Sequence, residues 1–159
     1  MSRFQLMHAR ALRSGALLVT TVTAIACAGT RPTDIGVTGG TLTPCPSSPN
    51  CVSSGDEDPD HKVAPLPLSA PAAQAWAAAR QAVLELPRTV IVSEHEGYLH
   101  AESTSALMGY VDDLELALAG DRIEVRSASR VGYGDGGVNR ERVAALRAAL
   151  VQAGVVATD

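Results

Sequence analysis

The sequence predicts a single α+β domain in which a helix, four antiparallel strands and a second helix follow one another, with both helices on one face of the sheet. Two segments with apolar residues at helical spacing flank four segments of alternating polarity. Turn residues at Glu96-Gly97 and Gly120-Asp121 separate neighbouring strands. The 159 residues, of which 46% are hydrophobic, suit one domain with appendages.

The first helix is predicted to begin near Ser69, a residue suited to capping, and Pro71, which fits the first helical turn. Alanine-rich sequence continues to Leu86, and Pro87 then ends the helix. The predicted apolar stripe consists of Trp76, Ala79, Val83 and Leu86.

The four strands are predicted from β-branched residues and from alternation along the chain. They are expected at 89–93, 98–103, 111–118 and 122–129. Because the side chains of a strand alternate between its two faces, leucine, isoleucine and valine residues of the last two strands share the face toward the helices. The other face carries both charge signs, so we expect either a solvated surface with cross-strand pairs or a binding face. Its charged residues are Glu102, Asp113, Glu115, Glu124 and Arg126.

A glycine-rich loop over residues 131–137 leads to the final helix, whose predicted apolar stripe is Val143, Leu146 and Leu150. Gly154 is expected to end this helix. Residues 154–159 are then a short C-terminal tail.

The N-terminus has the pattern of an export signal over residues 1–26. Arg3, Arg10 and Arg13 precede an uncharged run from 15 to 26, which is too short to predict a membrane-spanning helix. The run ends in Ala24-Ile25-Ala26, which suits ordinary leader cleavage.

Cys27 follows this run directly, and small residues before a cysteine resemble the bacterial lipobox. We therefore expect Cys27 to be lipidated, most simply with palmitate among its acyl chains, and the protein to be anchored in the cell envelope. Ala28 is not aspartate, which in a Gram-negative cell favours the outer membrane, facing the periplasm. Ordinary cleavage without lipidation is the alternative. Residues 27–44 are expected to form a lipidated N-terminus and a flexible tether.

Charge and composition exclude a general nucleic-acid binder. The net charge of −4 falls to about −7 when the leader is removed, because the leader holds three arginines and no acidic residue. Aromatic residues make up only 3% of the chain, so stacking platforms for single strands are missing.

Cys45 and Cys51 are separated by five residues in a proline-rich segment. In an exported protein this pair favours a structural disulfide. A redox pair or a metal site is the alternative, but the spacing is not that of a zinc motif. We expect no metal and no cofactor.

The glycine-rich loop is the best candidate for a ligand site. Free backbone N–H groups at a helix N-terminus can hold an anion, and nearby arginines can add charged hydrogen bonds. The candidate residues are Arg126, Arg130, Asp135, Asn139 and Arg140. In the structural alternative, Asp135 or Asn139 caps the helix and the arginines pair with Asp112, Asp113 or Glu102.

Two long motifs resemble the domain-of-unknown-function family 1499. They are CPSSPNCVSS at 45–54 and RSASRVGYGD at 126–135, the second continuing through Asn139 to Arg142. Val111-Asp112-Asp113 and the helix containing Trp76 lie between them, as in that family. The resemblance covers residues 45–150 and supports a domain over 45–153. It implies an exported or membrane-associated bacterial protein, and it carries no established activity.

These observations predict a lipid-anchored envelope protein that binds a partner protein or an anionic ligand through its polar sheet face and arginine-rich loop. The alternative is a small hydrolase or transferase that uses the same loop as an anion site. No nucleophile elbow or paired carboxylate dyad is present in the sequence, so enzymatic activity has no direct support.

Overall fold

The structure of the protein is a computed structural model that describes residues 28–158. The predicted signal and Cys27 therefore lie outside the described residues. The strands are β1 (Val37–Thr38), β2 (Thr41–Leu42), β3 (Cys51–Ser53), β4 (Leu66–Pro67), β5 (Thr89–His95), β6 (Tyr98–Thr104), β7 (Val111–Ala119) and β8 (Arg122–Ser129). The helices are α1 (Ala72–Glu85) and α2 (Val138–Gln152). Neither helix is long and apolar enough to cross a membrane.

The main sheet is antiparallel and confirms the predicted α+β class. Strands β5 to β8 form a meander in chain order, at the positions where the alternating segments predict them. Two short strands extend the sheet beyond β8, with β3 pairing near one end of β8 and β4 near the other. These strands of two and three residues were not predicted, because such lengths show no alternation.

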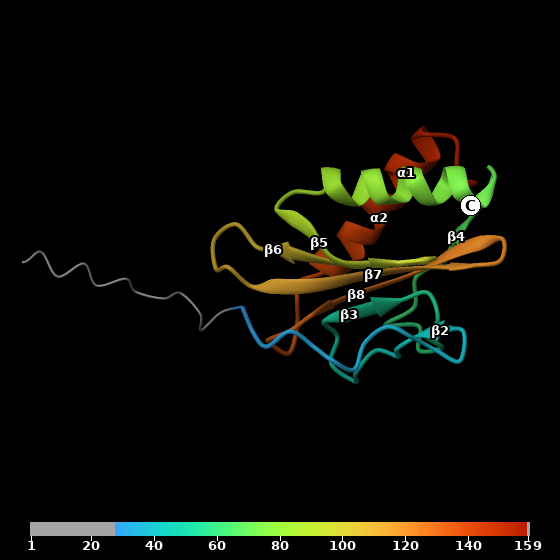
Figure 1. The fold of residues 1–159 in the computed structure, drawn as a ribbon. Helices are drawn as coiled ribbons and strands as arrows, with labels where there is room; N and C mark the ends of the chain where they lie inside the picture. Colours follow the sequence, from blue (N-terminus) through green and yellow to red (C-terminus); the bar gives the residue numbers. More distant parts are fainter. Residues whose placement is uncertain (1–27, 159) are drawn as a thin grey trace, which may run out of the picture.

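Both helices cover the same face of the sheet, as predicted (Figure 1). Small side chains of α1 pack there, so this helix contributes little volume to the core. The buried residues of α1 are Ala75, Ala79, Ala82 and Val83. The buried apolar residues of α2 are Val143, Leu146 and Leu150, the predicted stripe. Facing them from β6 to β8 are Leu99, Ala101, Leu114, Leu116, Ile123 and Val125.

The chain after α2 returns to the start of α1. Val155 and Val156 are buried, and the Ser69 N–H donates a hydrogen bond to the Val155 carbonyl at 3.0 Å. The Ala157 N–H donates to the Pro67 carbonyl at 2.9 Å. The described residues of the predicted tail therefore close one end of the core.

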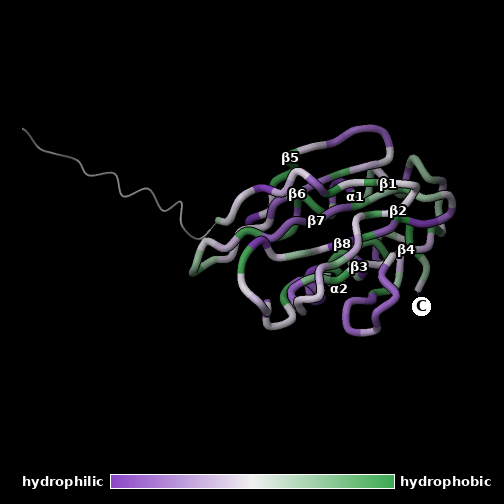
Figure 2. The backbone as a smooth tube through the Cα atoms, turned by 90° about the horizontal axis from the view of Figure 1, so that it is seen from below, coloured by the Kyte–Doolittle hydropathy of each residue, from purple (hydrophilic) through white to green (hydrophobic). Residues whose placement is uncertain are grey.

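The opposite face of the sheet, called the second face here, is covered by residues 28–44, which we name the N-terminal strap. Figures 1 and 2 show this segment lying along the sheet on the side away from the helices. Its hairpin β1–β2 brings Leu42 into a small apolar cluster with Tyr98 and Ala117. The segment expected to be a flexible tether is therefore packed against the domain, through contacts too widely spaced to produce a sequence pattern.

Candidate functional site

Charged side chains of three neighbouring strands meet on the second face. The antiparallel register sets Glu102 of β6 directly opposite Asp113 of β7, and Glu115 of β7 opposite Arg126 of β8. Two carboxylates directly opposite each other repel and require a shared cation. Asp113, Glu115 and Arg126 are buried, so the polar face predicted from alternation exists but is not a solvated surface at these positions.

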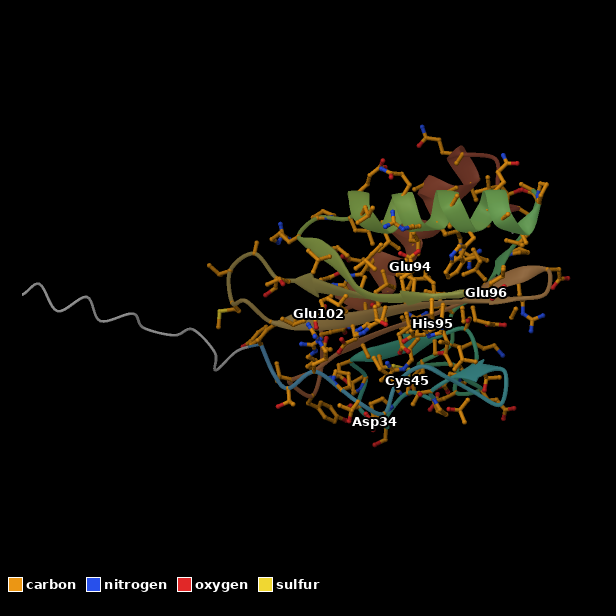
Figure 3. The ribbon with its side chains drawn as sticks, in the orientation of Figure 1. Asp34, Cys45, Glu94, His95, Glu96 and Glu102 are labelled. Atoms are coloured by element: carbon orange, nitrogen blue, oxygen red, sulfur yellow. A yellow bond between two sulfur atoms is a disulfide. The ribbon has the colours of Figure 1, made fainter. Side chains whose placement is uncertain are left out.

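Arg130 supplies the cation that the two opposed carboxylates require. Its Nε donates to Asp113 Oδ2 at 2.9 Å, and one terminal nitrogen donates to Asp113 Oδ1 at 2.7 Å and also to Glu102. His100 Nε2 lies 2.7 Å from Asp113 Oδ1. Arg31 of the strap donates to Glu102 from the other side. The strap is therefore tied by charge to the sheet that it covers, with Glu102 on the sheet and Asp34 on the strap below it (Figure 3).

These pairs lower the pKa values of both carboxyl groups. Burial by itself raises the pKa of Asp113, but hydrogen bonds from Arg130 and His100 outweigh burial and hold it below its usual range. For Glu102, the hydrogen bond from Arg31 is the largest influence, and it lowers the pKa against the opposing effect of burial. Both groups are therefore carboxylates at neutral pH.

A second buried pair lies beside the first on the same face. Arg126 donates through one terminal nitrogen to Glu115 Oε2 at 2.9 Å, and the Tyr98 hydroxyl donates to Glu115 Oε1 at 2.9 Å. Burial, followed by the negative charge of Glu115, raises the pKa of Tyr98 well above its usual value. The Nε of Arg126 is buried and has no hydrogen-bond acceptor among residues 28–158.

A cavity of about 280 Å³ separates the strap from the second face, and we call it the strap cavity. The strap contributes Pro32 and Ile35 to its wall, and the sheet contributes Arg126 and Arg130. The strap side of the cavity also carries the polar residues Thr30, Asp34 and Thr43, and the sheet side holds the guanidinium groups of Arg126 and Arg130 together with Asp113.

A different polar network lies on the helix face, at the glycine-rich loop. Asn139, fully buried at the start of α2, joins the loop to the ends of the strands. Its amide nitrogen donates to the Asn50 carbonyl at 3.1 Å and to the Ser129 hydroxyl at 3.0 Å. Its amide oxygen accepts from the Ser127 hydroxyl at 2.6 Å and from Arg142 at 2.5 Å. Both polar atoms of the Asn139 side chain therefore take part in hydrogen bonds.

Asp135 occupies the helix N-terminus that an anion would need. Gly136 and Gly137 have φ values of +65° and +88°, so the loop turns sharply before α2. The Asp135 carboxylate then accepts backbone N–H groups from Gly137 at 3.0 Å and from Asn139 at 2.9 Å. Burial raises the pKa of Asp135, but these hydrogen bonds outweigh it and the pKa lies below its usual range.

The five residues predicted to bind one ligand lie in three separate places. Asp135 and Asn139 lie together at the loop. Arg126 and Arg130 lie on the second face, across the sheet. Arg140 lies on the outer surface of α2 and donates to the carbonyl oxygens of Asp60 and Lys62, at 2.7 and 2.8 Å.

Two residues outside the predicted set are central to these networks. Arg142 donates to Asp112 Oδ2 at 2.6 Å and to the Ser127 hydroxyl at 2.9 Å, joining α2 to both central strands. Arg142 is three residues after Asn139, so both side chains lie on one side of the helix. This spacing could have predicted from the sequence that the two residues interact. The pairing of Arg31 could not be predicted from the sequence, because its partner Glu102 is 71 residues away.

The predicted disulfide between Cys45 and Cys51 is present, with an S–S distance of 2.03 Å. Cys51 begins β3 and is buried, so the bridge ties the segment that follows the strap to the sheet edge. The bond excludes a metal site at these two sulfurs.

These features define a class of protein: a small α+β domain with a disulfide-closed entry loop, a capped glycine-rich loop and buried arginine–carboxylate pairs. The family model described as "Protein of unknown function (DUF1499)" matches residues 41–150. The chain therefore belongs to this family, which confirms the resemblance of its two motifs. The curated proteins contain no match to the chain.

Proposed function

We propose that this protein is an exported, lipid-anchored cell-envelope protein that binds a small molecule in the strap cavity. The basic leader, the short apolar run and Cys27 support the export and the anchor. In a Gram-negative cell, the residue after Cys27 favours the outer membrane, with the domain in the periplasm.

The anchor predicts that Cys27 is the acylated residue. Cells that express the full-length chain and are fed radioactive palmitate should yield a labelled protein in the membrane fraction, and Cys27→Ser should remove the label. The double variant Cys45→Ser/Cys51→Ser is the matched control and should keep it, because the disulfide is not part of the anchor. Equal labelling of Cys27→Ser and the wild type would contradict the proposal.

One observation carries the ligand proposal: Arg126 lines the strap cavity, and its buried Nε has no acceptor among the described residues. A buried N–H group without an acceptor costs about 1–3 kcal/mol. An oxygen atom supplied by a bound molecule removes this cost. The apolar part of the wall then suits the remainder of a small ligand.

The charges on the second face favour an uncharged acceptor over an anion. Arg31, Arg126 and Arg130 face Glu102, Asp113 and Glu115, so three cations already meet three carboxylates. An additional buried anion would have no uncompensated cation to pair with. We therefore assign the ligand an amide or hydroxyl oxygen, rather than the anion expected from the sequence.

Nuclear magnetic resonance tests this assignment through the side-chain Nε–H signals of the arginines. The mature protein in detergent micelles is titrated with acetamide and, separately, with acetate. We expect acetamide to move the Arg126 Nε–H signal in a saturable way and acetate to move it less. The Arg130 Nε–H, which already donates to Asp113, is the internal control and should stay in place. An Arg126 signal that responds to neither probe overturns the ligand proposal, and a stronger response to acetate overturns the choice of an uncharged acceptor.

A further inference from the structure

Large hydrophobic side chains are exposed mainly at one end of the molecule. Of the eight that are exposed within residues 28–158, five come from the β6–β7 loop, the glycine-rich loop and the first residue of α2. We call these five residues the apolar end: Leu107, Met108, Tyr110, Tyr133 and Val138. The other three, Val37, Leu84 and Val90, come from three separate elements, and scattered exposure of this kind is ordinary.

The two loops of the apolar end are held in defined positions. The Ser105 N–H donates to the Tyr110 carbonyl at 2.8 Å, and the Tyr110 N–H donates to the Ser105 hydroxyl at 2.9 Å. These bonds close the β6–β7 loop and leave Leu107 at its tip with 92% of its surface exposed. Tyr110 and Val138 line one cavity of about 360 Å³ with glycines of the neighbouring loop. The two loops therefore form one continuous end.

The chain enters the domain at this same end. Gly29 lies against the start of the glycine-rich loop, so closely that a Cβ atom there would be 2.8 Å from Arg130 Cβ and 3.0 Å from Val131 Cγ1. Figure 1 shows the blue start of the described chain and the β6–β7 loop at the same side of the molecule, and Figure 2 shows hydrophobic residues at the tip of that loop. Cys27 directly precedes Ala28, and neighbouring Cα atoms are about 3.8 Å apart.

Because the strap is packed on the sheet, it does not act as a flexible spacer between the lipid anchor and the domain. Residues 28–44 run back along the second face, where Arg31 pairs with Glu102 and Leu42 packs on Tyr98. A lipid group on Cys27 would therefore hold the apolar end close to the membrane surface. Exposed apolar side chains at a membrane surface gain free energy by leaving water.

We propose that the apolar end is a membrane-docking surface that inserts Leu107 and Tyr133 into the interfacial layer of the bilayer that holds the anchor. This inference rests on the lipid anchor of the proposed function. Insertion is apolar in origin, because the chain without its leader carries a net charge of about −7 and has no excess of cations to attract anionic lipids. The contact is therefore expected to persist at high salt.

Site-specific labelling of the lipidated protein tests the contact. Cys27 carries lipid and Cys45 is bonded to Cys51, so an introduced cysteine is the single free thiol. We would place an environment-sensitive fluorophore at Leu107→Cys, at Tyr133→Cys and, as the matched control, at Val37→Cys of the hairpin β1–β2. Val37 is 46% exposed and lies on the strap, away from the apolar end. The proteins are reconstituted in phosphatidylcholine–phosphatidylethanolamine vesicles with nitroxide-labelled lipids.

The labels at 107 and 133 are expected to shift to the blue and to show at least about twofold stronger quenching by the nitroxide lipids than the label at 37. The difference should be the same at low and at high salt. Equal quenching at all three positions in vesicle-bound protein overturns the docking surface and leaves the anchor intact. Protein that does not sediment with the vesicles overturns the anchor, and with it the docking surface.

Discussion

Replacing Asn139 with alanine is expected to lower the free energy of unfolding by about 3–4 kcal/mol. The side chain is fully buried and serves as both donor and acceptor to groups from three parts of the chain. Alanine removes one hydrogen-bond partner each from the Asn50 carbonyl, the Ser127 hydroxyl and Arg142, and weakening a buried polar network in this way is costly. Urea unfolding followed by the fluorescence of Trp76, the single tryptophan, measures the effect.

Glu141→Ala is the matched control, because Glu141 lies two residues further along the same helical turn and is exposed. It should change stability little. Asn139→Asp gives a second readout, since the aspartate keeps the acceptor but faces the Asp135 carboxylate, which lies 2.9 Å from the amide nitrogen in the native protein. That variant should recover stability as the pH falls. An Asn139→Ala variant as stable as Glu141→Ala would refute the role of this network.

Replacing Arg130 with methionine is expected to cost about 4 kcal/mol at pH 7. Methionine keeps much of the length of the side chain but removes the cation between two opposed carboxylates, of which Asp113 is only 2% exposed. Breaking a buried pair in this way leaves an uncompensated charge, which is the main origin of the cost. Arg130→Lys should recover part of the stability, because a lysine keeps the charge but not the forked geometry.

The cost of Arg130→Met should depend on pH in a defined direction. In the wild type the pKa of Asp113 is lowered, so its contribution to stability is complete above the unfolded value of about 3.9 and is lost as the pH falls through the lower folded value. Without Arg130, only His100 opposes burial, which is the largest influence on this pKa. We expect the pKa of Asp113 to rise above its unfolded value, so the variant loses stability as the pH rises toward the raised value. The difference between the two proteins should therefore widen from pH 4 to pH 7.

Urea unfolding across this pH range measures the difference. Arg122→Met is the matched control, because Arg122 also pairs with a carboxylate, Glu124, but is half exposed. It should show a small effect without a comparable pH trend. A pH-independent difference for Arg130→Met would show that lost packing, and not the charge of Asp113, explains its destabilisation.

The packed strap changes how the domain would be presented at a membrane. A tether of 18 residues would let the domain sample many orientations, whereas a strap tied at Arg31 and Leu42 restricts them. The strap also forms the outer wall of the strap cavity. The proposed anchor, ligand site and docking surface therefore depend on the same short segment.

The secondary structure was predictable because its signals are local. Alternation identified β5 to β8, helical spacing identified the stripe of α2, and the cysteine spacing together with the proline-rich segment identified the disulfide. The alternation of side chains between the two faces of each strand also predicted which charged residues share the second face. The two long motifs predicted the family, and the family model confirmed it across residues 41–150.

The candidate site was predicted only in part. Asp135 at the helix N-terminus and Arg130 beside Asp113 and Glu102 agree with the structural alternative considered for the loop. Arg126 and Arg130 do not lie with Asn139, because Asn139 contacts Ser127 and Ser129, whose side chains point to the opposite face of the sheet from Arg126. The sequence reasoning also missed the partly buried Arg142, which joins α2 to β7 and β8.

The sequence by itself determined the two helices, the four long strands and their faces, the disulfide and the family, because each depends on residues close together in the chain or on a recognisable motif. Only the tertiary structure decided that residues 28–44 lie on the sheet, that β3 and β4 extend its edge, and which charges meet. Those outcomes depend on register and on pairs such as Arg31–Glu102, 71 residues apart. Contacts over such separations leave no periodic pattern, since they arise only when folding has placed the strands side by side.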